Sequence, residues 1–307
     1  MTRSRSSERG QVLVLTTLFL VGMLGITALT VDVGSWFRAQ RDTQRIADAA
    51  ALAGAQALPY DVSKARDDAN TYTSKNGGLA ATVSFRSTNA GTDTIQVEIR
   101  RDAPGFFAKI FGIDSVNVGA KAVALSSGIG AARWVAPIVV NEKHPMLNCN
   151  PQPCFGTMTE IELDHLHKPG SGNAAGSFAL ISLNDDDVDA NTLADWLLIG
   201  YDGYMKKDED YRSAPSASFN NGQFQSALEK RKGTEMLFPI YKKITGSGST
   251  AQYEVIGFVG FVVEKVIGGG SNQRLQGYFT RVVWDSLPDL TPSAGTDFGV
   301  RSIELIE

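Results

Sequence analysis

The most constraining feature of this sequence is a stretch near its N-terminus that carries no charged residue. It runs from Gly10 to Val31, and its apolar part, residues 12–31, reads VLVLTTLFLVGMLGITALTV. Twenty helical residues rise about 30 Å, which is the thickness of the hydrocarbon core of a bilayer. Threonine hydroxyls in such a helix bond back to its own carbonyls and do not exclude it from a membrane. Residues 12–31 therefore predict a transmembrane helix.

The charges on the two sides of this stretch indicate its orientation. Three arginines (Arg3, Arg5 and Arg9) and one acid precede it, and Asp32 follows it directly. By the positive-inside rule, residues 1–11 form a cytoplasmic tail and the chain after the helix lies outside the cytoplasm. A cleaved secretory signal or prepilin-like processing is the alternative. The apolar region is longer than the usual length of about 7–15 residues, and no A-x-A cleavage site follows it, which favours an uncleaved anchor.

The composition of the whole chain excludes several classes of protein. Of its 307 residues, 43% are hydrophobic and 20% are charged, as in a folded chain of two or three domains. The formal net charge of −4 argues against nucleic acid as the main partner. With two cysteines and three histidines, a disulfide-dense scaffold and a multi-metal cluster are excluded. The sequence holds no positive reason to expect an enzyme.

The apolar helix is expected to continue beyond the membrane. No proline or turn cluster interrupts the chain before Pro59, and the helix extension, residues 32–58, is rich in alanine. Spacings of four and three place six residues on one face of it: Ala39, Thr43, Ile46, Ala50, Ala53 and Ala57. This face either pairs with a helix of another subunit or packs on the chain's own next domain, and the sequence does not decide between the two.

The residues of this long helix also carry a family resemblance. They include Arg9-Gly10-Gln11, the apolar run, Val31-Asp32-Val33-Gly34 and the stretch Ala47–Ala55. Over residues 9–58 the sequence resembles the N-terminus of TadG-like proteins of the Tad (Flp) pilus assembly system. The resemblance implies a single-pass protein of the bacterial cytoplasmic membrane that helps to build or anchor a filament. Its implied partners are other pilus or pseudopilin subunits, contacted through the N-terminal helix.

Two other functions remain open from the sequence. The chain could be a minor pilin within the filament, or a binding or adhesion module displayed at the cell surface. Type IV prepilins carry a glutamate five residues after the glycine of their cleavage site. Counted from Gly10, this position is Leu15, and the departure argues against an ordinary pilin.

Residues 59–126 predict a small α+β module. Polar and apolar patterning indicates a surface helix over residues 61–75 and a hairpin of two strands over 80–87 and 94–101. It then indicates a short apolar helix over 105–111 and a third strand over 115–126. The apolar side chains of the short helix are interpreted as core, with an exposed partner-binding patch as the alternative: Phe106, Phe107, Ile110 and Phe111.

After a linker at residues 126–130, residues 127–307 predict a β-rich, antiparallel, sandwich-like domain outside the membrane, so that the overall class is α+β. Strands over 237–244, 253–266 and 275–284 form a meander, and its continuously apolar middle strand is buried on both faces. A helix is expected over 192–205, capped by Asp189 or Asn191. Its pattern DW-x-x-x-GY-x-G resembles C-terminal domains attached to some TadG-like proteins.

Cys149 and Cys154 are separated by four residues, two of which are proline. In an oxidising compartment a short-loop disulfide is the default for such a pair. Zinc is better served by the spacing C-x₂-C and would need two further ligands. We therefore expect a disulfide.

Two further clusters are weak candidates for metal binding. Asp185, Asp187 and Asp189 alternate as at the start of a calcium loop, but Ala190 and Trp196 stand where an EF-hand needs glycine and glutamate, so that a solvated turn is the alternative. The histidines His144, His165 and His167 could share a metal only if the fold brought them together. No other cofactor is expected.

A glycine-rich segment, residues 170–176, resembles a phosphate-binding loop only superficially. It lacks the Gly-Lys-Ser/Thr ending of such loops, and its glycine spacing differs. We expect a flexible loop there and no nucleotide partner.

Overall fold

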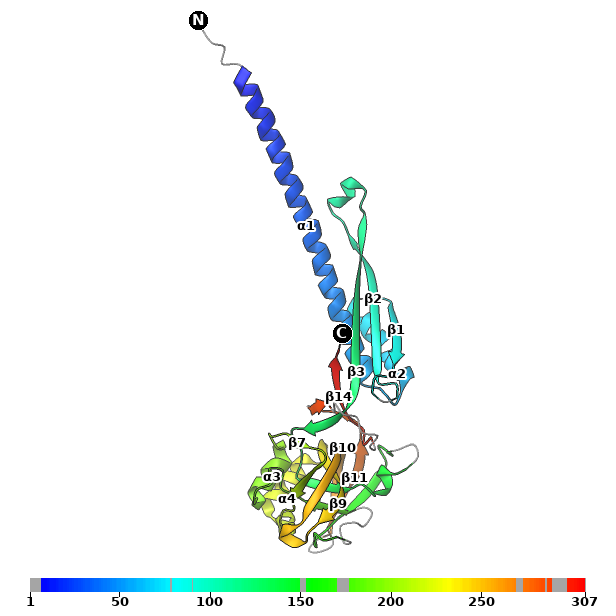
Figure 1. Cartoon of the computed structure of the whole chain (residues 1–307), viewed down its shortest axis with the longest axis vertical. Helices are drawn as coiled ribbons and strands as arrows, with labels where there is room; N and C mark the ends of the chain where they lie inside the picture. The colour runs from blue at the N-terminus through cyan, green and yellow to red at the C-terminus, as the bar shows by residue number, and fades with distance from the viewer. Residues whose placement is uncertain are drawn as a thin grey trace. The chain divides into compact units, whose positions relative to one another are not determined.

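The structure is a computed structural model that describes residues 7–77, 79–89, 91–149, 153–169, 177–268, 273–284, 286–288 and 297–306. Most of the expected cytoplasmic tail and the glycine-rich segment 170–176 lie outside the described residues. The chain divides into two compact units (Figure 1). The first unit comprises Met1–Ser126 with Ile303–Glu307, and the second comprises Ser127–Ser302.

The first unit begins with one continuous helix, α1, Ser7–Ala55. Its 49 residues correspond to about 73 Å at 1.5 Å per residue. The helix ends three residues before the predicted position because the chain tightens there into i to i−3 hydrogen bonds, such as Leu58 N–H to the Ala55 carbonyl at 3.1 Å, ahead of Pro59. The apolar stretch and its alanine-rich extension therefore form a single rigid element.

A second helix and a hairpin complete the first unit. Helix α2, Val62–Gly77, packs on α1 and buries Ala65, Ala69 and Thr73, which lie four residues apart. The antiparallel strands are β1, Ala81–Arg86, β2, Thr94–Pro104, and β3, Ser115–Ala132. Alternate residues of β2, namely Ile95, Val97 and Ile99, meet the alanines of the two helices in one core. The predicted helix, hairpin and third strand are all present.

Two boundaries in this region differ from the prediction. Residues 126–130, expected as a linker, continue strand β3, because Ser126 donates its hydroxyl to the Leu58 carbonyl at 3.0 Å and Ile129 pairs with β13, Ser286–Pro288. The end of the chain, placed by the prediction in the distal domain, belongs to the first unit from Ile303 onward. Ile306 donates its N–H to the Val123 carbonyl at 2.9 Å, which holds the end of β14, Val300–Leu305, beside β3.

The second unit is built on a sheet that closes on itself. Its ring follows the order β10–β9–β4–β6–β5–β11 and returns to β10 because β11 pairs with both β5 and β10. The ring strands are β4 (Ile138–Asn141), β5 (Met158–Leu163), β6 (Ser177–Leu180), β9 (Glu235–Thr245), β10 (Gln252–Ile267) and β11 (Arg274–Thr280). Strand pairs β4–β9 and β5–β6 are parallel and the other pairs are antiparallel. The α+β class and the antiparallel meander β9–β10–β11 are confirmed, and closure removes the free edges that a stacked pair of sheets would keep.

The second unit also contains shorter elements. They are β7 (Met205–Lys206), β8 (Glu209–Arg212), β12 (Val282–Val283) and the single turns η2 (Pro145–Leu147), η3 (Ser216–Asn220) and η4 (Gly248–Thr250). Strand β8 pairs with the beginning of β10. Within β10, the pairing register to β9 shifts between Val255 and Gly257, which is a β-bulge at one of the two glycines of this strand.

Two helices supply the rest of the second unit's core. Helices α3, Ala190–Ile199, and α4, Gly222–Arg231, pack on each other. They contribute to a cluster with the aromatic residues of the ring, through Leu193, Leu197, Phe224 and Leu228. Helix α3 is shorter than predicted because Gly200 adopts a φ of +86°, and a Cβ there would meet the backbone of Trp134 at 2.5 Å.

Candidate functional site

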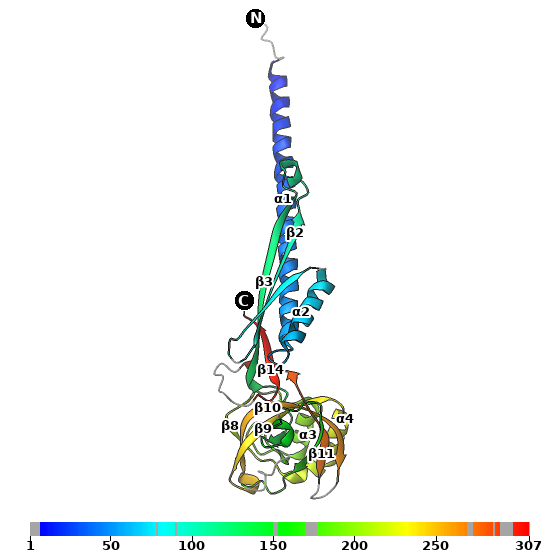
Figure 2. The same cartoon turned by 90° about the vertical axis from the view of Figure 1, so that its right-hand side faces the viewer.

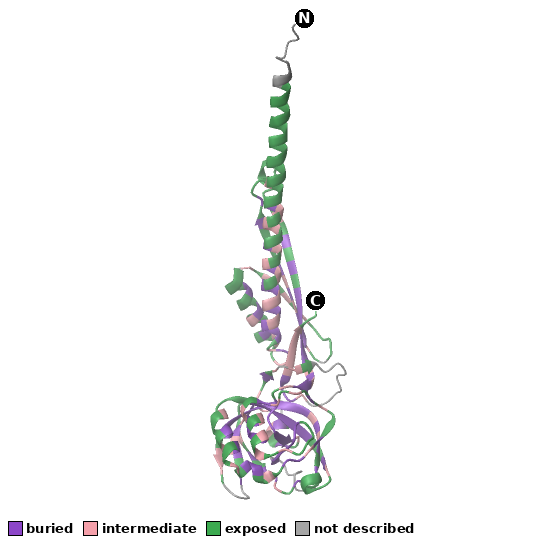
Figure 3. Ribbon diagram, turned by 90° about the vertical axis from the view of Figure 1, so that its left-hand side faces the viewer, coloured by how far each residue is buried: buried purple, intermediate pink, exposed green. Residues whose placement is uncertain are grey.

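The first half of α1 has the properties of a membrane span. The helix is long and apolar enough to cross a bilayer by length and composition, and its most apolar window is 0% buried. Figure 3 shows this half of α1 as exposed. Its four threonine hydroxyls donate to carbonyls one turn back at 2.8–2.9 Å, as predicted: Thr16 to Val12, Thr17 to Leu13, Thr27 to Met23 and Thr30 to Ile26. These side chains therefore leave no free hydroxyl donor on the span.

Asp32, the first acid after this span, binds the backbone of a segment more than 70 residues further along the chain. Asp32 is only 1% exposed, and its carboxylate accepts hydrogen bonds from the backbone N–H groups of Phe106, Phe107 and Ala108 at 2.5–3.2 Å. These groups open the turn η1, Ala108–Phe111, which joins β2 to β3. Figures 1 and 2 show the β2–β3 hairpin running along α1 up to this turn. We call this set of bonds the Asp32 clasp.

The electrostatics of the Asp32 clasp favour an ionised carboxylate. Burial by itself would raise the pKa of Asp32, but the N–H groups of Phe106, Ala108 and Phe107 together outweigh burial and lower the pKa below its ordinary value. Sequence reasoning missed this role of Asp32. The available signal was its position, a single acid directly after twenty-two uncharged residues.

Removing this carboxylate should free the turn. In the variant Asp32→Ala, the three N–H groups lose their acceptor, and we expect their amide hydrogen exchange to accelerate by about tenfold or more. Asp32→Asn keeps one acceptor oxygen and should give an intermediate rate. Asp42→Ala, on the same helix but bonded to Arg45, is the matched control. Unchanged exchange at Phe106 to Ala108 in Asp32→Ala would contradict the clasp.

The apolar residues of this turn are not core, and that prediction is wrong. Phe106, Phe107, Ile110 and Phe111 are 61%, 44%, 79% and 84% exposed. The predicted helix over 105–111 shortens to the four residues of η1, and such a turn at the end of a two-stranded hairpin has no second layer to cover it. The structure thus supports the alternative, an exposed apolar patch.

The small-residue face of the helix extension packs on the chain's own elements. Ala39, Thr43, Ile46, Ala50 and Ala53 are buried, and Ala57 is half-buried. Ile46 and Ala50 lie in the core with α2 and β2, and Ala39 contacts Ala103 and Val118 of the hairpin. This face is therefore not available to a helix of another subunit, and of the two interpretations the structure supports packing on the chain's own domain.

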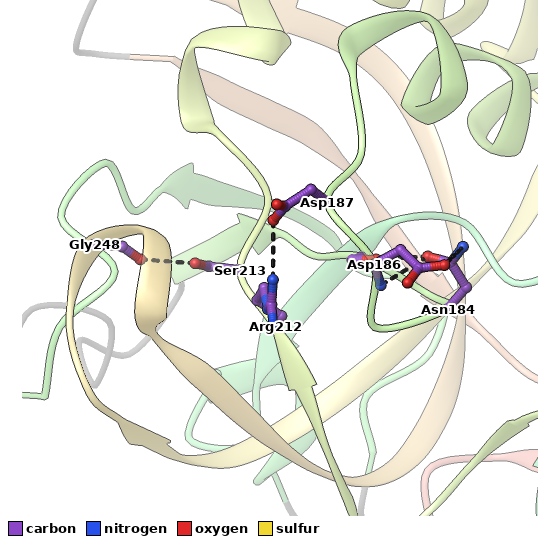
Figure 4. A network of polar contacts seen from close by, with 7 residues as sticks. Asn184, Asp186, Asp187, Arg212, Ser213 and Gly248 are labelled. Carbon is purple, nitrogen blue, oxygen red and sulfur yellow. Dashed lines mark hydrogen bonds and ion pairs between the residues drawn. The ribbon is translucent and has the colours of Figure 1, made fainter.

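The acidic turn of the second unit divides its carboxylates among different partners (Figure 4). Asp187 accepts from Arg212 at 2.9 Å, whereas Asp189 caps α3 through the Thr192 N–H at 2.8 Å, as predicted. Asp185 lies in the same turn with a φ of +62°. Among the described residues no group of three or more His, Cys, Asp or Glu side chains could hold a metal ion. Asp187 and Asp189 are therefore engaged by Arg212 and by the N-terminus of α3.

Two of the histidines are structural parts of the second unit's interior. His144 accepts at Nδ1 from the Met146 N–H at 3.1 Å and packs edge-on against Phe279. His167 bonds through Nδ1 to the hydroxyl of Tyr253 at 2.9 Å. His165 is half-buried and forms no metal-binding group with them among the described residues. Burial lowers the pKa of both His144 and His167, so the neutral form is favoured.

Those lowered pKa values predict acid sensitivity of the second unit. The unfolded chain takes up protons near pH 6.5, while the folded protein resists them until lower pH, so stability is complete above about pH 6.5 and falls below it. Asp164 opposes this effect at His167 without reversing it. The double variant His144→Asn/His167→Asn should flatten the pH dependence of the urea midpoint, because asparagine does not titrate. The fold should be kept, since asparagine can cap η2 and tolerates the φ of +42° at position 167. An equally steep dependence in that variant would contradict the assignment.

A buried tyrosine pair continues this polar interior. The hydroxyl of Tyr241 bonds to Ser177 at 2.9 Å and to Asn141 at 3.0 Å, and its ring meets that of Tyr253 edge-on at 4.9 Å. Burial raises the pKa of Tyr241 to about 12. These contacts connect strands β4, β6, β9 and β10, and no sequence motif indicates them.

Cys149 and Cys154 form the expected disulfide, with their Cα atoms 5.8 Å apart. The bond closes the segment that follows η2, where Cys154 also donates its N–H to the Met146 carbonyl at 2.8 Å. Such a short loop adds about 2 kcal/mol in the chain-entropy description. The disulfide therefore stiffens a local loop.

Comparison with known proteins places one part of the chain. No curated protein and no solved structure matches the chain. Residues 10–57 match the TadE/G-like Flp pilus-assembly family. The matched residues cover the apolar span, Asp32 and the helix extension, and this confirms the resemblance drawn from the sequence. Residues 10–57 of this chain are thus similar to the TadE/G-like Flp pilus-assembly family.

Proposed function

We propose that this protein is a membrane-anchored structural component of a Tad (Flp) pilus assembly system. Residues 12–31 span the bacterial cytoplasmic membrane once, the N-terminus lies in the cytoplasm, and the chain from Asp32 onward lies outside it. The observation that carries the proposal is that the family match at residues 10–57 falls on the exposed apolar helix. The chain acts by binding other pilus components, and not by catalysis.

Two independent features support the orientation. Three arginines precede the span and Asp32 follows it, which satisfies the positive-inside rule. The second unit contains the disulfide Cys149–Cys154, and such bonds persist in oxidising compartments outside the cytoplasm. Alkaline phosphatase fused after residue 306 should therefore be active, and the same enzyme fused before residue 12 should be inactive.

The buried face of the helix extension changes how partners can be reached. Because Ala39, Ile46 and Ala50 are covered by the chain's own hairpin and α2, contacts to other subunits fall to the span itself or to the exposed surfaces of the units. Within the span, Gly22 and Gly25 have no atom within 4 Å of the position of a Cβ. This open small-residue surface is where a second transmembrane helix can approach.

The test is genetic and biochemical together. Deleting the gene should abolish or strongly reduce piliation, and the full chain supplied in trans should restore it. A matched chain whose residues 1–31 are replaced by a cleavable signal releases residues 32–307 without the anchor and should not restore piliation. Normal piliation after deletion would refute the proposal.

The minor-pilin alternative makes a different prediction. N-terminal sequencing of the protein from each cell fraction should find the intact N-terminus in the membrane and none of the protein in sheared filaments. A processed chain within sheared filaments would instead establish a pilin, despite Leu15 in place of the glutamate of type IV prepilins.

A further inference from the structure

The turn between β2 and β3 presents an unusual surface, which we call the apolar tip. It consists of Phe106, Phe107, Ile110, Phe111 and Ile113, each between 44% and 84% exposed. Soluble proteins rarely leave several large apolar side chains together in water. The tip is also ordered: the β2–β3 pairing continues without a break to Pro104 and Ser115, and Gly112, with a φ of +80°, closes η1. The exposure is therefore a property of the folded hairpin.

The position of the apolar tip along α1 is set by specific bonds. The Asp32 clasp holds Phe106, Phe107 and Ala108 at the residue that directly follows the apolar span. One helical turn after Asp32, Trp36 of α1 donates its indole N–H to the Pro104 carbonyl at the end of β2, at 3.1 Å. Ala28 lies one turn before Asp32 on the same face and is half-buried, whereas the other described residues between Gln11 and Val31 are exposed. The tip thus reaches alongside the last turn of the span.

We propose that the apolar tip inserts into the leaflet of the bilayer at the Asp32 end of the span, as a second and interfacial membrane contact. When α1 crosses a membrane, the Asp32 clasp holds the tip at the surface of that membrane, because Asp32 directly follows the span. Aromatic and aliphatic side chains at this depth enter the boundary between headgroups and acyl chains. The occupant of the surface is therefore lipid.

The backbone of the apolar tip is prepared for an apolar medium. An irregular segment is tolerated at membrane depth only if its own polar groups are bonded within the protein. Asp32 accepts three N–H groups of the tip. Others bond inside the turn: Gly105 to Asp114, Ile110 to Phe107, Gly112 to Lys109 and Ile113 to Ala108, at 2.9–3.1 Å. The clasp and the bonds within the turn therefore satisfy these seven donors, which would otherwise oppose insertion.

Several basic side chains near the apolar tip fit a lipid headgroup region. Lys109 is exposed within the turn, and its long side chain can reach headgroup phosphates while its stem stays in the apolar layer. Arg38 and Arg41 are exposed on α1 within the three turns that follow Asp32, next to the exposed ring of Phe37. Aromatic and basic side chains at this level are typical of the membrane interface.

The experiment measures the depth of a probe on the full chain in vesicles. Lys109→Cys is labelled with a polarity-sensitive dye, since both native cysteines are in the disulfide, and the protein is reconstituted in phosphatidylethanolamine and phosphatidylglycerol vesicles. Some of the lipid carries a nitroxide near the headgroup end of its acyl chain. Only protein that floats with the vesicles is measured, which separates failure of α1 to insert from failure of the tip to insert. Ser63→Cys, exposed on α2, is the control label.

The nitroxide lipid should quench the Lys109→Cys probe severalfold and leave the Ser63→Cys probe unchanged. Adding Ile110→Ser and Phe111→Ser should release the Lys109→Cys probe from quenching and expose it to aqueous iodide. Quenching that persists in this triple variant, or iodide access in the unmodified tip, would overturn the inference. The inference depends on α1 spanning the membrane and not on a pilus function, so a normal piliation phenotype would leave it standing.

Discussion

Phe261→Ala is expected to cost the second unit about 3–5 kcal/mol of unfolding free energy, the largest loss that we predict for a single substitution. Phe261 is 0% exposed in the middle of β10, stacked on Phe238 at 5.2 Å and edge-on to Phe279 at 4.9 Å. Alanine would remove the aromatic group that joins β9, β10 and β11, and the closed ring has little freedom to collapse into the cavity. The loss should appear as a lower urea midpoint of the tryptophan fluorescence, since Trp134, Trp196 and Trp284 all lie in this unit.

The matched control is Phe111→Ala, the same substitution at a side chain that is 84% exposed. In detergent it should change the unfolding free energy by no more than about 0.5 kcal/mol. If Phe261→Ala does not fold, Phe261→Leu retains most of the volume and should cost less than about 1.5 kcal/mol. Equal losses for Phe261→Ala and Phe111→Ala would show that the assignment of core and surface is wrong.

Gly54→Ala is expected to destabilise the first unit by about 3 kcal/mol through overpacking. Gly54 lies where α1 meets both α2 and the sheet. A Cβ there would approach Ile95 Cδ1 to 2.5 Å and the Ala65 carbonyl oxygen to 2.7 Å. The second of these is backbone, which cannot turn aside, so α1 and α2 would have to separate. The measurement is the thermal midpoint of the first unit by circular dichroism and the amide exchange of α2.

Gly34→Ala provides the control on the same helix. No atom lies within 4 Å of the position of its Cβ, and alanine is the better helix former by about 1 kcal/mol. The variant should therefore be neutral or slightly more stable. A similar loss in both variants would mean that the contact with Ala65 and Ile95 does not decide the effect at Gly54.

Much of the fold could be predicted because it depends on local patterns. The absence of charge from Gly10 to Val31 and the lack of a breaker before Pro59 predict one long helix, and α1 has that form. Period-two alternation predicts β2, and the apolar runs around two glycine-rich turns predict the meander β9–β10–β11. The cap of α3 by Asp189 follows from the same kind of local rule.

The candidate site was harder to predict because it depends on residues far apart in the chain. The apolar sequence around Phe106 and Phe111 has the composition of a core, and composition does not report whether another layer lies above it. The Asp32 clasp joins residues 74–76 positions apart. The small-residue face of α1 had two interpretations of equal standing until the hairpin and α2 were seen to cover it.

The sequence by itself determined the apolar span and the continuity of the first helix, because these depend on local composition and periodicity. Its short motifs carried the resemblance to TadG-like proteins, which the family match at residues 10–57 confirms. The tertiary structure alone decided that the second unit's sheet closes into a ring, that the alanine face is occupied, and that an apolar turn is held at the end of the span by one carboxylate. The physical reason is the separation along the sequence of the residues that interact. Helix and strand patterns repeat within a few residues, whereas the pairing of distant strands and the burial of a face depend on which segments the whole chain brings together.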